Sequence, residues 1–333
     1  MTPAPRANPL LLGHLPAEAT LAEALRAGRL HHAWLLTGPP GIGKATLGFR
    51  FARRLLAGSG DGLAVPPTHP TFRRIAAGSH ADLLTIERAW DPKRKRLRGE
   101  IIVDDVRRVA DFLHLTPAEG GWRVVLLDGA EDLNRNAANA LLKVLEEPPP
   151  RAILLLICAA PGRLLPTIRS RCRRLPLAPL ADAVVGELLA RYLPEAPEAE
   201  RARLVTLAEG SIGRALQLAE GGALGIAELV SGVLDALPAL DPLRAYEVAD
   251  ALGRDEDSFS TFMDLLRGSL AAAVREAARG RADPDQMRLL GARPLDAWID
   301  VWHGLTQIQD ETEGLHLDRR QAIVAGFGLL AGR

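Results

Sequence analysis

The sequence predicts an α/β domain with a mostly parallel, helix-covered sheet, followed by two regions made of helices alone. Short apolar runs typical of buried strands alternate with amphipathic, helix-like segments as far as about residue 178. A glycine-rich loop separates the first of these runs from the helix that follows it. From Pro179 onward the apolar residues recur at helical spacing and no strand pattern is found.

The glycine-rich loop has the spacing of a phosphate-binding loop, or P-loop. The apolar run 33–37 is followed by Gly38-Pro39-Pro40-Gly41-Ile42-Gly43-Lys44, which fits G-x-x-x-x-G-K, and a helix is predicted over 44–56. With 31 glycines and four lysines in 333 residues, composition alone gives about 0.03 matches of this kind. A glycine-rich turn that binds nothing is the structural alternative.

Each part of the loop has a role in holding phosphate. Gly38, Gly41 and Gly43 allow consecutive backbone N–H groups to turn toward one anion, and the helix N-terminus adds the positive end of its dipole. Lys44 would reach the β- and γ-phosphates. Position 45 is Ala, whereas the complete motif has Ser or Thr there to hold Mg²⁺. The sequence therefore predicts phosphate binding, and Ala45 argues against hydrolysis.

The remaining elements of the first domain alternate in type. A helix over 15–27 precedes the first strand, and further strands are predicted over 83–88, 122–128 and 152–157. Helices are predicted from 101 to 113 and from 134 to 147, where three prolines end the second one. This alternation favours a mostly parallel sheet.

An acid ends the strand predicted over 122–128. Because ligands of open α/β sheets bind at the carboxyl ends of the strands, we expect Asp128 and the P-loop to share one crevice. An acid at that place suits a water-mediated contact to Mg²⁺. A helix-capping role is the structural alternative for Asp128.

Composition limits the class of function. The formal net charge is zero, so no global basic field attracts nucleic acid or an anionic membrane. Two cysteines, Cys158 and Cys172, are too few for a disulfide framework or a four-cysteine zinc site. We expect no signal peptide, and the sequence contains no apolar run long enough to cross a bilayer. We expect a cytoplasmic protein without zinc and without a membrane partner.

One strongly basic segment interrupts this balanced composition. Residues 91–99 read Asp-Pro-Lys-Arg-Lys-Arg-Leu-Arg-Gly, with Lys93 to Arg98 as the basic tip. A solvated hairpin is the simplest interpretation, contact with nucleic acid is the alternative, and the sequence does not decide between them.

Three domains are predicted. The nucleotide-binding domain covers 1–178, a small lid of three short helices covers 179–221, and an all-helical domain covers 222–333. Gly221-Gly222 is a plausible hinge between the last two. In the last domain Trp298, Trp302 and Leu305 recur at helical spacing, which is typical of a packed core or a helix–helix face rather than a cofactor site.

Three further motifs resemble a known family. Residues 139–149, Asn-Ala-Leu-Leu-Lys-Val-Leu-Glu-Glu-Pro-Pro, resemble the hallmark helix of the bacterial DNA polymerase III clamp-loader AAA+ subunits. Thr167 to Cys172 resembles their Ser-Arg-Cys motif, and Gly210 to Ala215 resembles their sensor 2 segment. Order and spacing match over about 10–220, most closely in the delta-prime branch, and the helical last third fits the family's collar domain.

The resemblance also indicates what this chain lacks. Active members have Ser or Thr at the position of Ala45, and the hydroxyl of Thr46 should point elsewhere because it lies about 100° further around the helix. They have a catalytic Glu after the strand-end Asp, where this chain has Gly129; Glu131 would need a different backbone path to replace it. Their polar sensor 1 position falls on Cys158-Ala159. The zinc-binding cysteines of many relatives are missing as well.

What the chain retains defines the expected function. Lys44 and Arg214 can still hold the phosphates of ATP or ADP, with Mg²⁺ bound weakly or not at all. In the family, the arginine at the position of Arg171 points at the γ-phosphate of a neighbouring subunit, where it stabilises charge in the transition state. A helix-capping or acid-pairing role is the structural alternative for Arg171.

The resemblance therefore implies a clamp-loader subunit without its own ATPase activity. Its partners would be the ATPase subunits gamma or tau and the clamp-opening delta subunit, and through them the sliding clamp and primed DNA. The alternatives are an active ATPase of the same family that uses Glu131 and Thr46, a P-loop kinase of small nucleotides, and a scaffold whose P-loop is empty.

Overall fold

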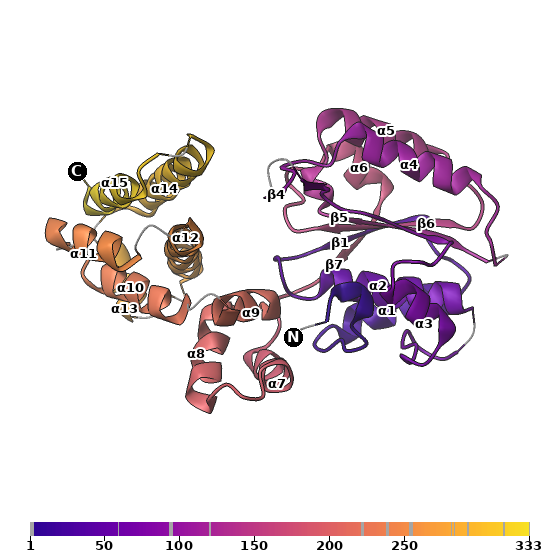
Figure 1. The fold of residues 1–333 in the computed structure, drawn as a ribbon, viewed down its shortest axis with the longest axis horizontal. Coiled ribbons are helices and arrows are strands. Elements are labelled where there is room, and N and C mark those ends of the chain that lie inside the picture. The colour runs from indigo at the N-terminus through magenta and orange to yellow at the C-terminus, as the bar shows by residue number, and fades with distance from the viewer. Residues whose placement is uncertain are drawn as a thin grey trace. The chain divides into compact units, whose positions relative to one another are not determined.

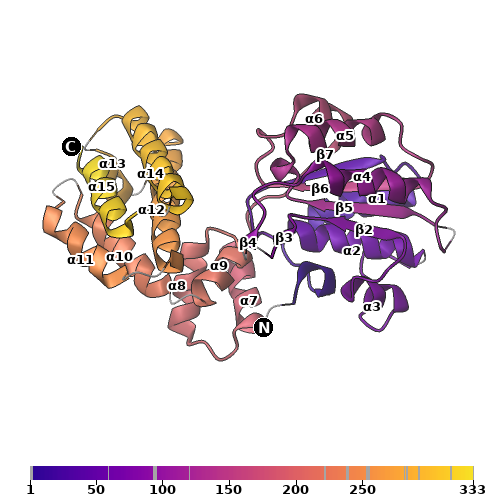
Figure 2. The same cartoon turned by 45° about the horizontal axis from the view of Figure 1, so that its top comes forward.

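The computed structural model (Figures 1 and 2) describes residues 3–58, 60–92, 96–119, 121–220, 223–237, 240–252, 256–280, 282, 284–291, 293–315 and 317–332. The chain forms two compact units, Met1–Ala215 and Leu216–Arg333, which are described separately. Lys93 to Lys95 of the basic tip and the expected hinge Gly221-Gly222 lie outside the described residues. The three domains expected from the sequence stay a prediction.

The first unit is built on a parallel sheet of five strands with the order β2-β5-β6-β1-β7. The strands are β1 (Ala33–Thr37), β2 (Leu83–Ile86), β5 (Arg123–Asp128), β6 (Ala152–Cys158) and β7 (Arg173–Pro176). In the central strands β1 and β6 every residue is buried, because helices cover both faces of the sheet. Burial on both faces explains why the sequences of these strands are almost entirely apolar. The predicted α/β class is confirmed.

Helices cover both faces of the sheet (Figure 1). On one face lie α4 (Val103–His114), α5 (Arg135–Glu146) and α6 (Pro166–Arg171). On the other face lie α1 (Leu15–Arg26), α2 (Lys44–Ala57) and α3 (Pro70–Ala76). Because the strands alternate their side chains between the faces, the sheet contributes to two separate apolar cores, one beneath each helical layer.

Short elements complete this layer structure. The strands β3 (Trp90–Asp91) and β4 (Arg96–Leu97) pair antiparallel, as in a hairpin, and β4 lies within the basic tip. The 3₁₀ turns η1 and η2 cover Pro5–Ala7 and Ala130–Asp132. The Asn134 side chain accepts a hydrogen bond of 2.9 Å from the Ala137 N–H and so fixes the start of α5.

Three helices follow the sheet, as predicted from the spacing of apolar residues. They are α7 (Asp182–Tyr192), α8 (Glu198–Ala208) and α9 (Ile212–Glu220). Of these, α7, α8 and the start of α9 belong to the first unit, and the boundary between the two units lies within α9.

Within its described residues, the second unit is all helix. Its helices are α10 (Ala223–Asp235), α11 (Pro242–Leu252), α12 (Glu256–Ala278), α13 (Pro284–Leu290), α14 (Leu295–Leu315) and α15 (Arg319–Ala331). α12 packs along α14, as Figure 2 shows, and α15 packs on both α11 and α14. Trp298 and Leu305 are buried between these helices, and the Trp298 indole N–H donates to the Leu290 carbonyl at 3.3 Å. None of the described helices has the length and apolar character that a bilayer-spanning helix needs.

Candidate nucleotide site

The P-loop connects the end of β1 to the start of α2. Gly38, Gly41 and Gly43 have φ angles of 148°, 73° and 103°, which are backbone conformations that favour glycine. Lys44 is the first residue of α2 and is almost fully buried, and its Nζ donates a hydrogen bond of 2.6 Å to the Pro39 carbonyl. Behind the loop, the buried His14 ring donates through Nε2 to the Ile42 carbonyl at 2.7 Å. No local sequence pattern indicates this contact.

The sensor 2 segment lies directly against the P-loop. The Ser211 hydroxyl donates to the Pro40 carbonyl at 2.9 Å, and the Gly213 N–H donates to the Gly41 carbonyl at 2.9 Å. A Cβ atom built on Gly213 would lie only 2.7 Å from the Gly41 Cα atom, so glycine is required for this approach. Together with Lys44, these donors engage three consecutive P-loop carbonyls, those of residues 39 to 41.

Unlike its carbonyl groups, most backbone N–H groups at the end of the P-loop are not used in hydrogen bonds among the described residues. Within the described part of the chain, no hydrogen bond is found for the N–H groups of Gly41, Gly43 and Lys44, whereas the turn at Pro40-Gly41 directs the Ile42 N–H toward the Pro39 carbonyl. Unpaired N–H groups before and at the first turn of a helix are the donors that bind phosphate oxygens. With the carbonyls engaged by other groups, the loop therefore presents donors for an anion.

An acid and a thiol lie at the adjacent strand ends. Thr37 is opposite Cys158 in the pairing of β1 with β6, and Asp128 is opposite Ile157 in the pairing of β5 with β6. Since these strands are neighbours and parallel, their carboxyl ends meet at the edge of the sheet that carries the P-loop. Asp128 is thus near Lys44, and the two side chains interact electrostatically.

Glu131 also enters this site, although the sequence alone favoured the opposite. The turn η2 brings its carboxylate to the end of β6, where Oε1 accepts a hydrogen bond of 2.7 Å from the Ala159 N–H. The second oxygen, Oε2, is buried and has no hydrogen-bond partner among the described residues. The structure therefore places the Glu131 carboxylate at the end of β6, and its use in place of the missing acid stays a prediction.

Burial dominates the electrostatics of the site. Burial lowers the pKa of Lys44, and the negative charges of Glu131 and Asp128 oppose this shift. Burial likewise raises the pKa of Asp128, with a further increase from Glu87 and an opposing decrease from Lys44. Burial, together with Glu131, raises the pKa of Cys158 to about 12, so the thiol is neutral and can donate its hydrogen. Each charged group here is therefore costly unless an opposite charge compensates it.

These residues fit the phosphates of a nucleotide. Lys44 and the unpaired loop amides are donors for phosphate oxygens, and Asp128 could hold Mg²⁺ through water. Ala45 provides no oxygen for the metal, and Thr46 is a buried residue of α2.

The two candidate arginines have different surroundings. The Arg214 backbone is close to the P-loop, but its guanidinium pairs with Glu209 at 3.4 Å. Arg171 is the last residue of α6, and its guanidinium pairs with Glu146 at 2.8 Å. The structure therefore groups the P-loop, Asp128 and the Arg214 backbone, while Arg171 is held by α5.

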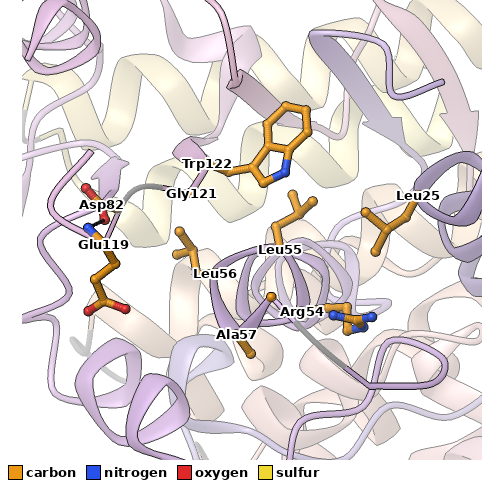
Figure 3. Close-up of a pocket in the computed structure, with 10 residues that line it drawn as sticks. Leu25, Arg54, Leu55, Leu56, Ala57, Asp82, Glu119, Gly121 and Trp122 are labelled. Atoms are coloured by element: carbon orange, nitrogen blue, oxygen red, sulfur yellow. Dashed lines mark hydrogen bonds between the residues drawn. The ribbon is translucent and has the colours of Figure 1, made fainter. Parts of the chain in front are cut away.

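A separate cavity lies at the opposite end of the strands, beside the start of β5 and the end of α2. It has a volume of about 330 Å³ and is lined by the end of α2, by Trp122 before β5, and by Leu25 (Figure 3). Asp82 on its wall accepts hydrogen bonds of 2.8 Å and 3.1 Å from the Ala118 and Glu119 N–H groups, which is a structural role. The cavity adjoins the C-terminal end of α2 and the start of β5, whereas Lys44 and Asp128 lie at the other ends of these elements, so the cavity is not part of the nucleotide site.

Comparison with known proteins identifies the family. A sequence model described as DNA polymerase III, delta subunit, matches residues 14–181, which is half of the chain. The chain belongs to this family. The predicted resemblance to the DNA polymerase III clamp-loader family is therefore confirmed.

Individual relatives agree with the family match. The chain is 42% identical over 181 residues to DNA polymerase III subunit delta' of Pseudomonas aeruginosa, covering 54% of this chain and 53% of the relative. It is 37% identical over 201 residues to subunit delta' of Escherichia coli, covering 60% and 58%. It is 34% identical over 204 residues to subunit tau of Escherichia coli, covering 60% and 30%. The chain thus spans little more than half the length of the delta' relatives it matches.

Solved structures are similar at lower identity. A gamma subunit-related protein of DNA polymerase III from Thermotoga maritima has 18% identity and a TM-score of 0.40, with 94% of this chain and 99% of that chain covered. The DNA clamp loader delta protein of Bacillus subtilis has 11% identity and a TM-score of 0.34, with 95% and 99% covered.

Proposed function

We propose that this chain is a delta-prime-like subunit of the bacterial replicative clamp loader. It would stand in a ring with the ATPase subunits, tau or gamma, and with the clamp-opening delta subunit, in the cytoplasm. The ring would place a sliding clamp on primed DNA for the polymerase. The family match over 14–181 is the observation that carries this proposal, and the 42% identity to a delta' subunit supports the choice of branch.

In this role the chain binds nucleotide without hydrolysing it. Lys44 and the unpaired amides of the P-loop support phosphate binding. Ala45 removes a metal ligand, and Gly129 stands where the family has the acid that orients water. Hydrolysis needs all of these groups in place at once, so their joint loss favours retention over turnover.

One observation favours a second candidate, an active ATPase. The Glu131 carboxylate reaches the end of β6 and keeps one buried oxygen without a partner, as a residue that orients water would. Mg²⁺-dependent ATP turnover by the purified chain that Lys44→Ala and Glu131→Gln both abolish would establish this candidate and exclude the first.

The chain would contribute Arg171 to catalysis in a neighbouring subunit. Its side chain is about one-third exposed and lies at the end of α6, so it is accessible to another protein. A guanidinium that meets the phosphates of a neighbour's ATP stabilises the charge that develops in the transition state.

Reconstitution of the complex tests this role. With Arg171→Ala the isolated chain keeps its thermal unfolding midpoint, while the assembled complex loses its DNA-stimulated ATP turnover, since such an arginine contributes roughly 10³-fold or more to the rate at the site it serves. Arg169→Ala, a change on the same helix, is the matched control and should leave turnover unchanged. Full activity of the Arg171→Ala complex would disprove the role in trans.

A further inference from the structure

Arg171 is fixed at two points of its guanidinium. Nη2 lies 2.8 Å from Glu146 Oε1, and Nη1 donates to the Thr167 carbonyl at 3.1 Å. Glu146 is the last residue of α5, which packs against α6, so the two helices bring the carboxylate and the guanidinium together at their C-terminal ends. The geometry of this pair is set by the packing of the helices rather than by a flexible loop.

The pair has little value for stability. The Arg171 and Glu146 side chains are 36% and 49% exposed, and an ion pair in that environment contributes little to the free energy of folding. Its effect is on conformation. A free arginine side chain samples many rotamers, and an ion pair together with one hydrogen bond on the same guanidinium restricts that freedom.

The pair also leaves the guanidinium able to bind a further anion. A guanidinium has five N–H donors, and of its two described contacts only the one to the Thr167 carbonyl is a hydrogen bond. The remaining donors suit the oxygens of a phosphate, which arginine binds with two parallel hydrogen bonds. A positively charged group that is already oriented has no ordering to undergo when charge develops on that phosphate.

We propose that Glu146 is a positioning residue for Arg171: its carboxylate holds the guanidinium in the orientation in which it meets a phosphate of the nucleotide bound by the neighbouring subunit. This inference rests on the proposed role of Arg171 in trans. It assigns to Glu146, the last residue of α5, a function that acts through Arg171, without contact of its own to the nucleotide.

Steady-state kinetics of the reconstituted complex test the inference. Glu146→Gln removes the negative charge of the ion pair, so we expect kcat for DNA-stimulated ATP hydrolysis to fall about tenfold while KM for ATP stays within twofold. Glu146→Asp keeps the charge and should restore part of kcat. Glu147→Gln is the matched control, because Glu147 is the exposed next residue and the described contacts give its carboxylate no ion pair.

A double variant separates this inference from the function on which it rests. Adding Glu146→Gln to Arg171→Ala should cause no further loss, since the acid acts only through the arginine. If Arg171→Ala abolishes turnover while Glu146→Gln keeps the wild-type kcat, the positioning role is wrong and the role in trans stands. If Arg171→Ala has no effect, the role in trans fails. Loss of folding or assembly in Glu146→Gln would also overturn the inference, because the residue would then be structural.

Discussion

The contact between Gly213 and Gly41 gives the sharpest prediction for stability. Gly213→Ala adds a Cβ atom that would lie 2.7 Å from the Gly41 Cα atom and 3.3 Å from the Gly41 carbonyl oxygen. Both neighbours are backbone atoms, so no side chain can rotate away to make room. Either the start of α9 or the P-loop must move.

The magnitude follows from three opposing effects. Alanine gains at most about 1 kcal/mol over glycine in a helix. Overpacking in a close contact costs about 1–3 kcal/mol, and separating the two segments loses about 1 kcal/mol from the hydrogen bond of the Gly213 N–H to the Gly41 carbonyl. We therefore expect Gly213→Ala to lower the free energy of unfolding of the first unit by about 1–3 kcal/mol.

A second glycine provides the control. Gly186 lies inside α7, where a new Cβ atom would meet only a Val205 methyl at an ordinary 3.8 Å. Gly186→Ala should therefore raise the free energy of unfolding by about 0.5–1 kcal/mol. Hydrogen exchange of the β6 amides reports on the first unit alone and measures both changes. The proposed contact would be refuted if the two variants were equally stabilised.

Two further predictions concern the nucleotide site and the buried thiols. Lys44→Ala should weaken ATP binding by about ten- to a hundredfold, because a charged hydrogen bond to phosphate is lost. Titration of labelled ATP measures the dissociation constant of both chains. A wild-type chain that binds no nucleotide would favour the scaffold whose P-loop is empty. Burial raises the pKa of both Cys158 and Cys172 to about 12 from a usual 9.0, so the unfolded chain loses these protons first and the fold should lose stability as the pH rises above about 9. Urea unfolding at pH 8 and pH 10 with reductant present checks this, and Cys172→Ala should show a smaller loss; an equal loss in that variant would contradict the assignment to the thiol.

Most of the fold could be predicted because its elements carry local patterns. The strands β1, β5 and β6 are continuous apolar runs, and the long helices repeat their apolar residues at helical spacing. β7 was missed, since three of its four residues are exposed and it includes two arginines and a proline, which is typical of an edge strand. The short helices α6 and α13 were missed as well, because six or seven residues are too few to establish a period.

The candidate site also contains some residues that the sequence predicts and others that only the structure reveals. The P-loop could be read from the sequence because its glycines and Lys44 are neighbours in the chain. Glu131 could not, since its distance from Asp128 along the chain says nothing about the turn that carries it to Ala159. The bond from Ser211 to Pro40 joins residues 171 positions apart, and only the fold brings them together.

The sequence by itself determined the class of fold, the P-loop and the family, since all three can be recognised from patterns in short stretches of neighbouring residues. The tertiary structure decided which groups meet: sensor 2 on the P-loop, Glu131 at the end of β6, and Glu146 on Arg171. The physical reason is that local patterns depend on the conformation of one segment, whereas these contacts depend on how separate helices and strands pack against each other.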